Sequence, residues 1–292
     1  MSDCFTKCSV HLYADDTVIY YSNKEVSTVQ STINKELRSL DAWMKRNKLL
    51  VNCIKTVSML IGTKRMLTKH NTLDLNFGDV KLSQVESFIY LGLHVDNELK
   101  WNLHVEHLCK KVGKIINYLG RLKHFINSSA LKTIYNTVIL PYFDYADVVW
   151  QSSTKTIIDQ LQKLQNRAAR IILGVNPYEH KSVIELHDLL NWEKLENRRK
   201  ANLLSFVYKT LHGMTPEYML QTFVLKYSHY DLRRSSIKLP KPKTDNCKRT
   251  FMYRGAMFYN TVSLEAKQSP SLKEFNKRVN QYTNHIVQRF TW

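Results

Sequence analysis

Two adjacent aspartates near the start of the chain, Asp15 and Asp16, are the residues whose type and spacing could do chemistry. They stand between two runs of β-branched and aromatic residues, 10–13 and 17–21, which predict two short strands joined by a tight turn. Neighbouring carboxylates repel each other, but their hard oxygen atoms suit Mg²⁺. Two such ions can activate an attacking oxygen and stabilise a leaving oxygen in phosphoryl transfer. The alternative is a solvated turn, in which the aspartates only bond the local backbone.

The segment Tyr13-Ala14-Asp15-Asp16, with the strands on either side, resembles the catalytic hairpin of reverse transcriptases. The residues that follow look like those of non-LTR retrotransposons of the LINE type, and in particular jockey-like elements. The resemblance implies an RNA-directed DNA polymerase that uses Mg²⁺, an RNA template and a DNA primer. It makes Asp15 the metal-binding aspartate and Asp16 its neighbour, whose role is less direct.

Two later motifs fit the same resemblance. Residues 43–56 look like the next motif of the polymerase palm, in which a lysine can donate a proton to departing pyrophosphate, and Lys55 is the matching residue. An ordinary surface lysine is the alternative. Tyr90-Leu91-Gly92 resembles the primer grip, a turn that holds the 3′ end of the primer. A glycine there would let another chain approach closely, although the same residues could form a plain strand.

The elements that must position these groups are a helix and further strands. Ser22 and Glu25 have the spacing of a capping box, and apolar residues follow at helical intervals over 26–43. We expect this helix to pack against the back of the aspartate hairpin. Residues 62–70 are polar and basic and predict a loop, while 73–82 predict another hairpin.

From residue 98 onward the sequence predicts helices. An apolar stripe that includes Ile115 runs over 105–126, and basic residues lie largely off that stripe. They are Lys110, Lys111, Lys114, Arg121 and Lys123. Placed after a primer grip, this helix resembles a polymerase thumb that lies against template–primer phosphates, although such a face can also be merely solvated.

The next two helices carry further candidates. Ser128 or Ser129 should cap a helix that Pro141 ends. The following helix, near 157–171, carries Arg167 and Arg170 on its polar sides. It also carries the amides Gln162, Gln165 and Asn166, for which a position on the helix surface is favoured over a contact with nucleic acid.

The C-terminal part turns basic and irregular over 227–254. Arg233 and Arg234 lie in this stretch, with Tyr227, Tyr230 and Tyr253 as candidates for stacking on bases. A linker and a nucleic-acid-contact strip are the two interpretations that remain open.

Composition favours a polyanionic partner. Lys and Arg number 43 against 25 for Asp and Glu, a formal net charge of +18 over 292 residues. No apolar run of membrane-spanning length and no secretory leader is visible, so we expect an intracellular protein, in the nucleus or the cytoplasm. The five scattered cysteines are then expected as free thiols. Two groups hint weakly at zinc: Cys4, Cys8 and His11, and His104, His107 and Cys109.

These observations predict an α+β protein with three parts. Residues 1–97 would form the C-terminal part of a polymerase palm, 98–176 a thumb-like helical region, and 177–292 a helical, basic region. Reverse transcriptases place the fingers, the first metal-binding aspartate motif and a Gln-Gly template motif before the catalytic hairpin, and Met1 to Val10 cannot contain them. We expect the endonuclease of these elements to be missing as well. We therefore expect a 5′-truncated reverse transcriptase that is inactive by itself; the alternative is a non-catalytic nucleic-acid-binding protein.

Overall fold

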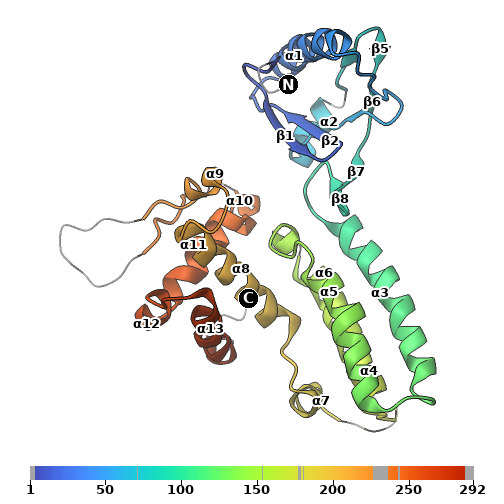
Figure 1. Cartoon of the computed structure of the whole chain (residues 1–292), viewed down its shortest axis with the longest axis vertical. Coiled ribbons are helices and arrows are strands. Elements are labelled where there is room, and N and C mark those ends of the chain that lie inside the picture. Colours follow the sequence, from blue (N-terminus) through green and yellow to red (C-terminus); the bar gives the residue numbers. More distant parts are fainter. Residues whose placement is uncertain are drawn as a thin grey trace, which may run out of the picture. The chain divides into compact units, whose positions relative to one another are not determined.

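The computed structural model describes residues 4–70, 72–152, 154–176, 179, 181–225, 236–242 and 244–286. The chain forms two compact units, Met1–Leu99 and Lys100–Trp292 (Figure 1). The first unit mixes helices with short strands, and the second is built from helices. This mixture agrees with the expected α+β class, whereas the assignment to palm and thumb, and the division at 97 and 176, stay predictions. No helix in the described ranges is long and apolar enough to cross a membrane.

The first unit contains short strands that pair two by two. Its elements are β1 (Ser9–Tyr13), β2 (Asp16–Tyr20), α1 (Val26–Arg46), β3 (Val57–Ser58), α2 (Lys64–Lys69), β4 (Asn76–Phe77), β5 (Val80–Lys81), β6 (Ser83–Gln84), β7 (Ser87–Tyr90) and β8 (Leu93–Asp96). Three pairs are antiparallel hairpins, β1–β2, β4–β5 and β7–β8, while β3 and β6 pair in parallel. The hairpins expected at the aspartates and within 73–82 are therefore confirmed.

Helix α1 covers the core of this unit. Leu37 and Leu40 are buried, and Ile19 of β2 packs against the same cluster. The other buried members are Leu73, Leu75, Phe77 and Leu82. The expected packing of this helix against the aspartate hairpin is thus found at Ile19.

Two local expectations in this unit were wrong. The capping box at Ser22 does not form, because α1 begins at Val26 and its N-cap residue is Glu25, which makes no side-chain cap. Instead, the Asn23 side chain accepts the Glu25 N–H at 3.1 Å. The stretch expected as a loop over 62–70 contains α2, whose first turn is capped by the Thr63 hydroxyl.

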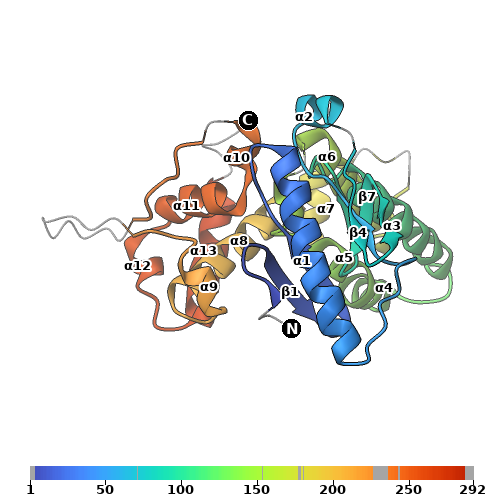
Figure 2. The same cartoon turned by 90° about the horizontal axis from the view of Figure 1, so that it is seen from above.

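The second unit consists of helices. They are α3 (Asn102–Leu122), α4 (Ser128–Ile134), the π-helical turn η2 (Tyr135–Ile139), α5 (Leu140–Asp144), the 3₁₀ turn η3 (Trp150–Ser152), α6 (Lys155–Ile172), α7 (Val183–Leu190), α8 (Leu195–Leu211), α9 (Glu217–Leu220), α10 (Asp245–Arg249), α11 (Phe251–Thr261), α12 (Leu264–Lys267) and α13 (Leu272–Ile286). Helices α3 and α6 pack along each other, and α8 packs on α11 and α13 (Figure 2). Ser182 and Glu185 form a complete capping box at the start of α7.

Two expectations around α4 were also wrong. Asn127, rather than Ser128 or Ser129, caps α4, since its side chain accepts the Ala130 N–H at 2.9 Å. Pro141 does not end the helix, which continues through η2 into α5. A wider π-helical turn before a proline relieves the clash with the preceding turn and the loss of one hydrogen-bond donor.

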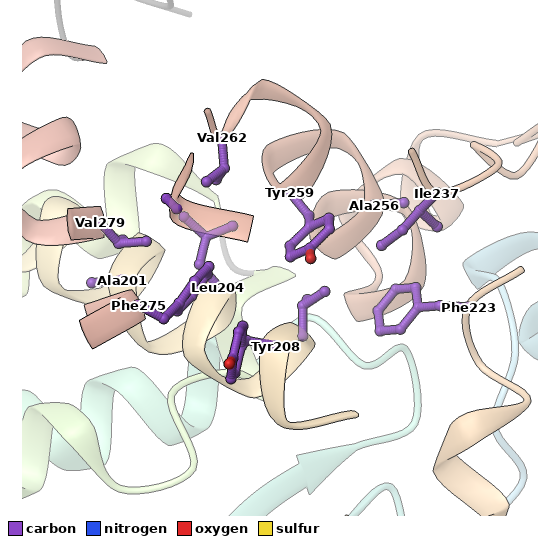
Figure 3. Close-up of a cluster of buried hydrophobic side chains, with 12 residues drawn as sticks. Ala201, Leu204, Tyr208, Phe223, Ile237, Ala256, Tyr259, Val262, Phe275 and Val279 are labelled. Atoms are coloured by element: carbon purple, nitrogen blue, oxygen red, sulfur yellow. The ribbon is translucent and has the colours of Figure 1, made fainter. Parts of the chain in front are cut away.

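The C-terminal helices share one apolar core, which Figure 3 shows. Tyr208 of α8 stacks on Phe275 of α13, with ring centroids 4.4 Å apart, and its hydroxyl donates to the Ser269 carbonyl at 2.6 Å. Gly255 of α11 lies so close to α8 that a Cβ atom there would approach Val207 Cγ2 to 2.9 Å and Phe223 Cζ to 3.0 Å.

Gly255→Ala should therefore destabilise this unit by about 1–3 kcal/mol, the usual cost of overpacking a core. Gly62→Ala is the matched control, because its nearest neighbour would be 3.6 Å away, an ordinary contact. Urea unfolding of the two variants and the parent chain measures the difference. Equal midpoints for Gly255→Ala and the parent would show that α11 and α8 can separate at no cost.

Candidate catalytic hairpin and nucleic-acid-binding helix

The two aspartates lie at the tip of the β1–β2 hairpin. Ala14 and Asp15 form the turn, and Asp16 pairs with Tyr13 as the first residue of β2. Both carboxylates are exposed. Ala14 has a φ of 50°, in the left-handed region that residues with a Cβ rarely adopt. The turn therefore holds some backbone strain, which is common where a tight turn serves a site.

Helix α1 anchors the segment that enters this hairpin. The Glu36 carboxylate, on a residue only 4% exposed, accepts the Thr6 hydroxyl at 2.8 Å and the N–H groups of Thr6 and Lys7 at 3.0 Å each. Burial alone would raise the pKa of Glu36, but the hydrogen bonds from Thr6, Lys7 and Cys8 outweigh it and lower that pKa below its usual value. The charged carboxylate thus fixes the chain just before β1.

Glu36→Ala should destabilise the first unit by about 1–3 kcal/mol, because the charge-assisted hydrogen bonds from Thr6 and Lys7 are lost, although these exposed donors can turn to water instead. Glu36→Gln keeps an acceptor oxygen and should cost less. Since the pKa of Glu36 is lowered on folding, its contribution is present at neutral pH and is lost as the pH falls through the folded-state pKa.

Chemical denaturation at pH 7 and at pH 4 measures this anchor, with the exposed Glu25→Ala as control. Unfolding of Glu36→Ala at the same denaturant concentration as Glu25→Ala would exclude the anchor.

The donor set at the hairpin tip suits Mg²⁺ in kind. Asp15 and Asp16 offer hard carboxylate oxygens, which could hold such an ion and supply it to phosphoryl transfer. Within the described ranges, no group of three or more His, Cys, Asp or Glu residues comes together as a metal site. The two aspartates are therefore a partial donor set. The same finding disfavours both candidate zinc sites. One consists of Cys4, Cys8 and His11, and the other of His104, His107 and Cys109.

Lys55 is exposed and lies in a turn built around Asn52. The Asn52 side chain accepts the N–H groups of Ile54 and Lys55, both at 3.2 Å. The backbone carbonyl of Asn52 accepts the Thr56 N–H at 3.0 Å and the Thr56 hydroxyl at 2.9 Å. Asn52 and Thr56, which belong to the same motif as Lys55, thus shape the turn that presents the lysine. Its role as a proton donor stays a prediction.

The segment Tyr90-Leu91-Gly92 forms the turn of the β7–β8 hairpin. Tyr90 pairs with Leu93, and both turn residues are left-handed, with φ of 46° at Leu91 and 77° at Gly92. Glycine adopts this conformation without steric cost, and its exposed backbone leaves room for a close neighbour. The geometry agrees with a turn, and contact with a primer stays a prediction.

The basic residues of α3 are exposed, as expected: Lys110, Lys111, Lys114 and Arg121, with Lys123 following at its end. The apolar stripe differs in one position, because Ile116 is fully buried while Ile115 is only partly so. Lys111 Nζ lies 4.7 Å from the ring centre of Tyr142 on α5.

On α6 the two arginines have different surroundings. Arg167 is exposed and donates to Asn117 Oδ1 of α3 at 2.6 Å, so it lies beside the exposed side of that helix. Arg170 is partly buried and donates to the Lys181 carbonyl at 3.2 Å, which ties α6 to the segment before α7. Arg233 and Arg234, together with Tyr227 and Tyr230, lie outside the described residues.

Of the three α6 amides expected on the helix surface, Gln165 is buried, while Gln162 and Asn166 are half-buried. Gln165 is 2% exposed and donates to the Glu193 carbonyl at 3.1 Å, while Gln162 accepts the Leu195 N–H at 3.0 Å. Asn166 Oδ1 lies 2.9 Å from His187 Nε2 of α7. Gln162 and Gln165 thus satisfy backbone groups at the start of α8, and Asn166 bonds a side chain of α7, so these amides hold helices together.

Sequence reasoning missed a cluster of charged residues that joins the end of α5 and the segment after it to helix α8. Arg198 binds Asp144 through two hydrogen bonds, of 2.6 and 2.7 Å. Arg199 is 3% exposed and lies 4.2 Å from the ring centre of Trp150, and burial lowers the pKa of Arg199 to about 10. Burial also raises the pKa of Asp147 to about 6, because the Asn202 hydrogen bond and the Arg199 charge offset only part of it. Adjacent arginines on an amphipathic helix gave no signal that one would be buried.

The raised pKa of Asp147 predicts a pH-dependent stability. The folded protein binds this proton more tightly than the unfolded chain, so stability decreases as the pH rises from about 4 through 6. Asp147→Asn removes this titration, and the variant should gain about 1 kcal/mol relative to the parent between pH 5 and pH 7.5. Urea unfolding at the two pH values measures the difference in free energy of unfolding between Asp147→Asn and the parent. The exposed Asp188→Asn serves as control. If the difference for Asp147→Asn does not change with pH, the pKa of Asp147 is not raised by burial.

Curated proteins of Drosophila melanogaster transposable elements are similar to most of this chain. No family model matches the chain. A Drosophila melanogaster protein named "Probable RNA-directed DNA polymerase from transposon BS" is 27% identical over 66% of this chain and 21% of its own length. One from transposon X-element in the same organism is 24% identical over 58% of this chain and 19% of its own length. A 115 kDa protein of its type-1 retrotransposable element R1DM is 23% identical over 72% of the chain and 20% of its own length.

The chain therefore spans about a fifth of the length of the curated relatives it matches. The resemblance drawn from the aspartate hairpin and the motifs after it is confirmed at the level of sequence. At 23–27% identity over most of its length, this chain is similar to RNA-directed DNA polymerases and a related protein of Drosophila non-LTR retrotransposons.

Proposed function

We propose that this chain supplies the catalytic hairpin and the primer-positioning part of a non-LTR reverse transcriptase. The observation that carries the proposal is the pair of exposed carboxylates, Asp15 and Asp16, at the tip of a hairpin that Glu36 anchors to α1. Likeness to proteins named RNA-directed DNA polymerases supports the same chemistry. The substrates would be an RNA template, a DNA primer and deoxynucleotides, with Mg²⁺ as the metal.

In this proposal each motif has one task. Asp15, supported by Asp16, would hold a Mg²⁺ ion that activates the 3′ oxygen of the primer, and Lys55 would give a proton to the pyrophosphate that leaves. The turn Tyr90-Leu91-Gly92 holds the primer end, and the basic residues of α3 bind the phosphates of the template–primer. Because two adjacent carboxylates do not form a full two-metal site, a further carboxylate must come from another polypeptide segment. We expect no polymerase activity from these 292 residues alone.

The test is template-directed DNA synthesis with Mg²⁺, by the purified chain alone and with a fragment of a related element that carries the fingers and the first aspartate motif. Extension only in the mixture supports the proposal. As a positive control, the same fragment must restore activity to the matching segment of its own element. If it does so but gives no extension with this chain, the proposal is overturned.

A second function, nucleic-acid binding without catalysis, is favoured by the net charge of +18 and the exposed basic side of α3. It predicts binding that weakens steeply with salt and shows little sequence preference. The same mixture distinguishes the two functions, since only the first yields primer extension.

A further inference from the structure

An exposed ridge on α3 combines positive charge with an aromatic ring. Lys110, Lys114, Tyr118 and Arg121 follow one another at intervals of four, four and three residues, so they lie in a line along one side of the helix. All four are exposed. Successive members are about 4.5–6 Å apart along the helix axis. We call these four residues the α3 ridge.

The neighbouring helices leave this ridge uncovered. On one flank, Gly113 and Gly120 face α6, where a Cβ would lie 4.0 Å from Leu164 and 3.6 Å from Ile171. On the other flank, Lys111 reaches over the ring of Tyr142 on α5. The packing of α3 therefore uses the sides next to the ridge, and the ridge itself faces outward.

Tyr118 is the unusual member of the ridge. Its side chain is 61% exposed, and the Arg121 guanidinium carbon lies 5.6 Å from its ring centre, within the range of a cation–π contact. A single exposed aromatic residue is ordinary on a protein surface. A ring set among three cations is different, because it offers a flat apolar face at the place where the cations would attract a polyanion.

The chemistry of the ridge selects one class of partner. A single-stranded nucleic acid has both phosphates for the cations and unpaired bases whose faces can stack on the ring. In a duplex the bases stack on one another, so the ring would have no partner there. The Arg167 side chain, held by Asn117 beside the ridge, adds a fourth positive charge.

We propose that Tyr118 is a stacking platform for an unpaired base, and that the α3 ridge prefers single-stranded nucleic acid over duplex. This inference rests on the proposed binding of template–primer phosphates by α3. It adds that the α3 ridge holds the part of the template that is not paired with the primer, and that Tyr118 stacks on a base there. Arg121 pairs with a phosphate next to the stacked base, while Lys110 and Lys114 hold the phosphates farther along the strand.

Fluorescence anisotropy with the full chain tests the proposal, using a labelled 20-nucleotide oligo(dT) and a 20-base-pair duplex as probes. Tyr118→Ala should weaken binding to the single strand about tenfold, and Tyr118→Phe should keep the parent affinity. Neither change should alter duplex binding. Tyr218→Ala is the matched control, because Tyr218 is similarly exposed, at 65%, but belongs to α9.

The outcomes separate this inference from the function on which it rests. Equal loss on single strand and duplex, or no loss on either, would overturn stacking at Tyr118. If stacking at Tyr118 were overturned but the double variant Lys110→Gln, Lys114→Gln still bound nucleic acid more weakly, the proposal that α3 binds nucleic acid would stand. Absence of any salt-dependent binding by the parent chain would overturn both. Circular dichroism of Tyr118→Ala checks that α3 remains folded.

Discussion

Asp15→Asn should abolish primer extension in a mixture of this chain with the fragment that supplies the fingers and the first aspartate motif. The carboxylate at the hairpin tip is the group that we expect to hold a catalytic metal ion, and an amide oxygen is a much weaker ligand for Mg²⁺. The loss should be about a thousandfold or more, because the position of the metal provides much of the rate. Lys55→Ala in the same mixture should slow extension about a hundredfold, as expected for a general acid.

The fold should not change in Asp15→Asn. Asp15 is exposed in a turn, and asparagine is well accepted in turns. Asp79→Asn is the matched control, since it alters another exposed aspartate at the β4–β5 hairpin turn. Extension by Asp15→Asn at the rate of Asp79→Asn would mean that Asp15 binds no catalytic metal.

Replacing Lys110, Lys111 and Lys114 together by glutamine should weaken nucleic-acid binding about a hundredfold at 0.1 M salt. Each phosphate contact contributes about 0.7 to the slope of log affinity against log salt for a single strand, so three lost contacts should reduce that slope by about 2. The three side chains are exposed, and Lys111 Nζ lies over the ring of Tyr142. Stability should fall by less than about 1 kcal/mol.

A variant with the same change in charge provides the control. Lys24, Lys64 and Lys69 are exposed in the first unit, and their replacement by glutamine also removes three positive charges. Equal weakening by both variants would show that the attraction depends on net charge alone. An unchanged salt slope in the α3 variant would show that this helix does not contact phosphates.

The sequence predicted best the features that local chemistry determines. The β1–β2 and β4–β5 hairpins combine short strand-forming runs with turn residues, and both are present. At residues 90–92 the resemblance implied a turn while the residues alone left a plain strand open, and the structure has the turn of the β7–β8 hairpin there. Helix α1 was expected from its apolar periodicity, although its first residue was misplaced. The roles of Asp15, Lys55 and the turn at Gly92 are not decided by these shapes, and they stay predictions.

The features that the sequence did not reveal depend on contacts between distant segments. Gln165 has the pattern of a surface amide, and it is buried because the Glu193 carbonyl reaches it from 28 residues away. Arg199 is buried because Trp150 provides a ring for its guanidinium. The helix continues past Pro141 because a π-helical turn absorbs the strain. Such partners cannot be read from periodicity within one helix.

The measurement that tests the central claim most directly is cleavage of the chain by Fe²⁺ bound in place of Mg²⁺, in the complemented mixture with template and primer. With ascorbate and peroxide, bound iron cuts the polypeptide near its own ligands. The account predicts cuts within residues 13–16 of the parent chain that excess Mg²⁺ suppresses and that Asp15→Asn lacks. Cuts that are absent from this hairpin, or that persist unchanged in Asp15→Asn, would contradict the claim that the hairpin holds the catalytic metal.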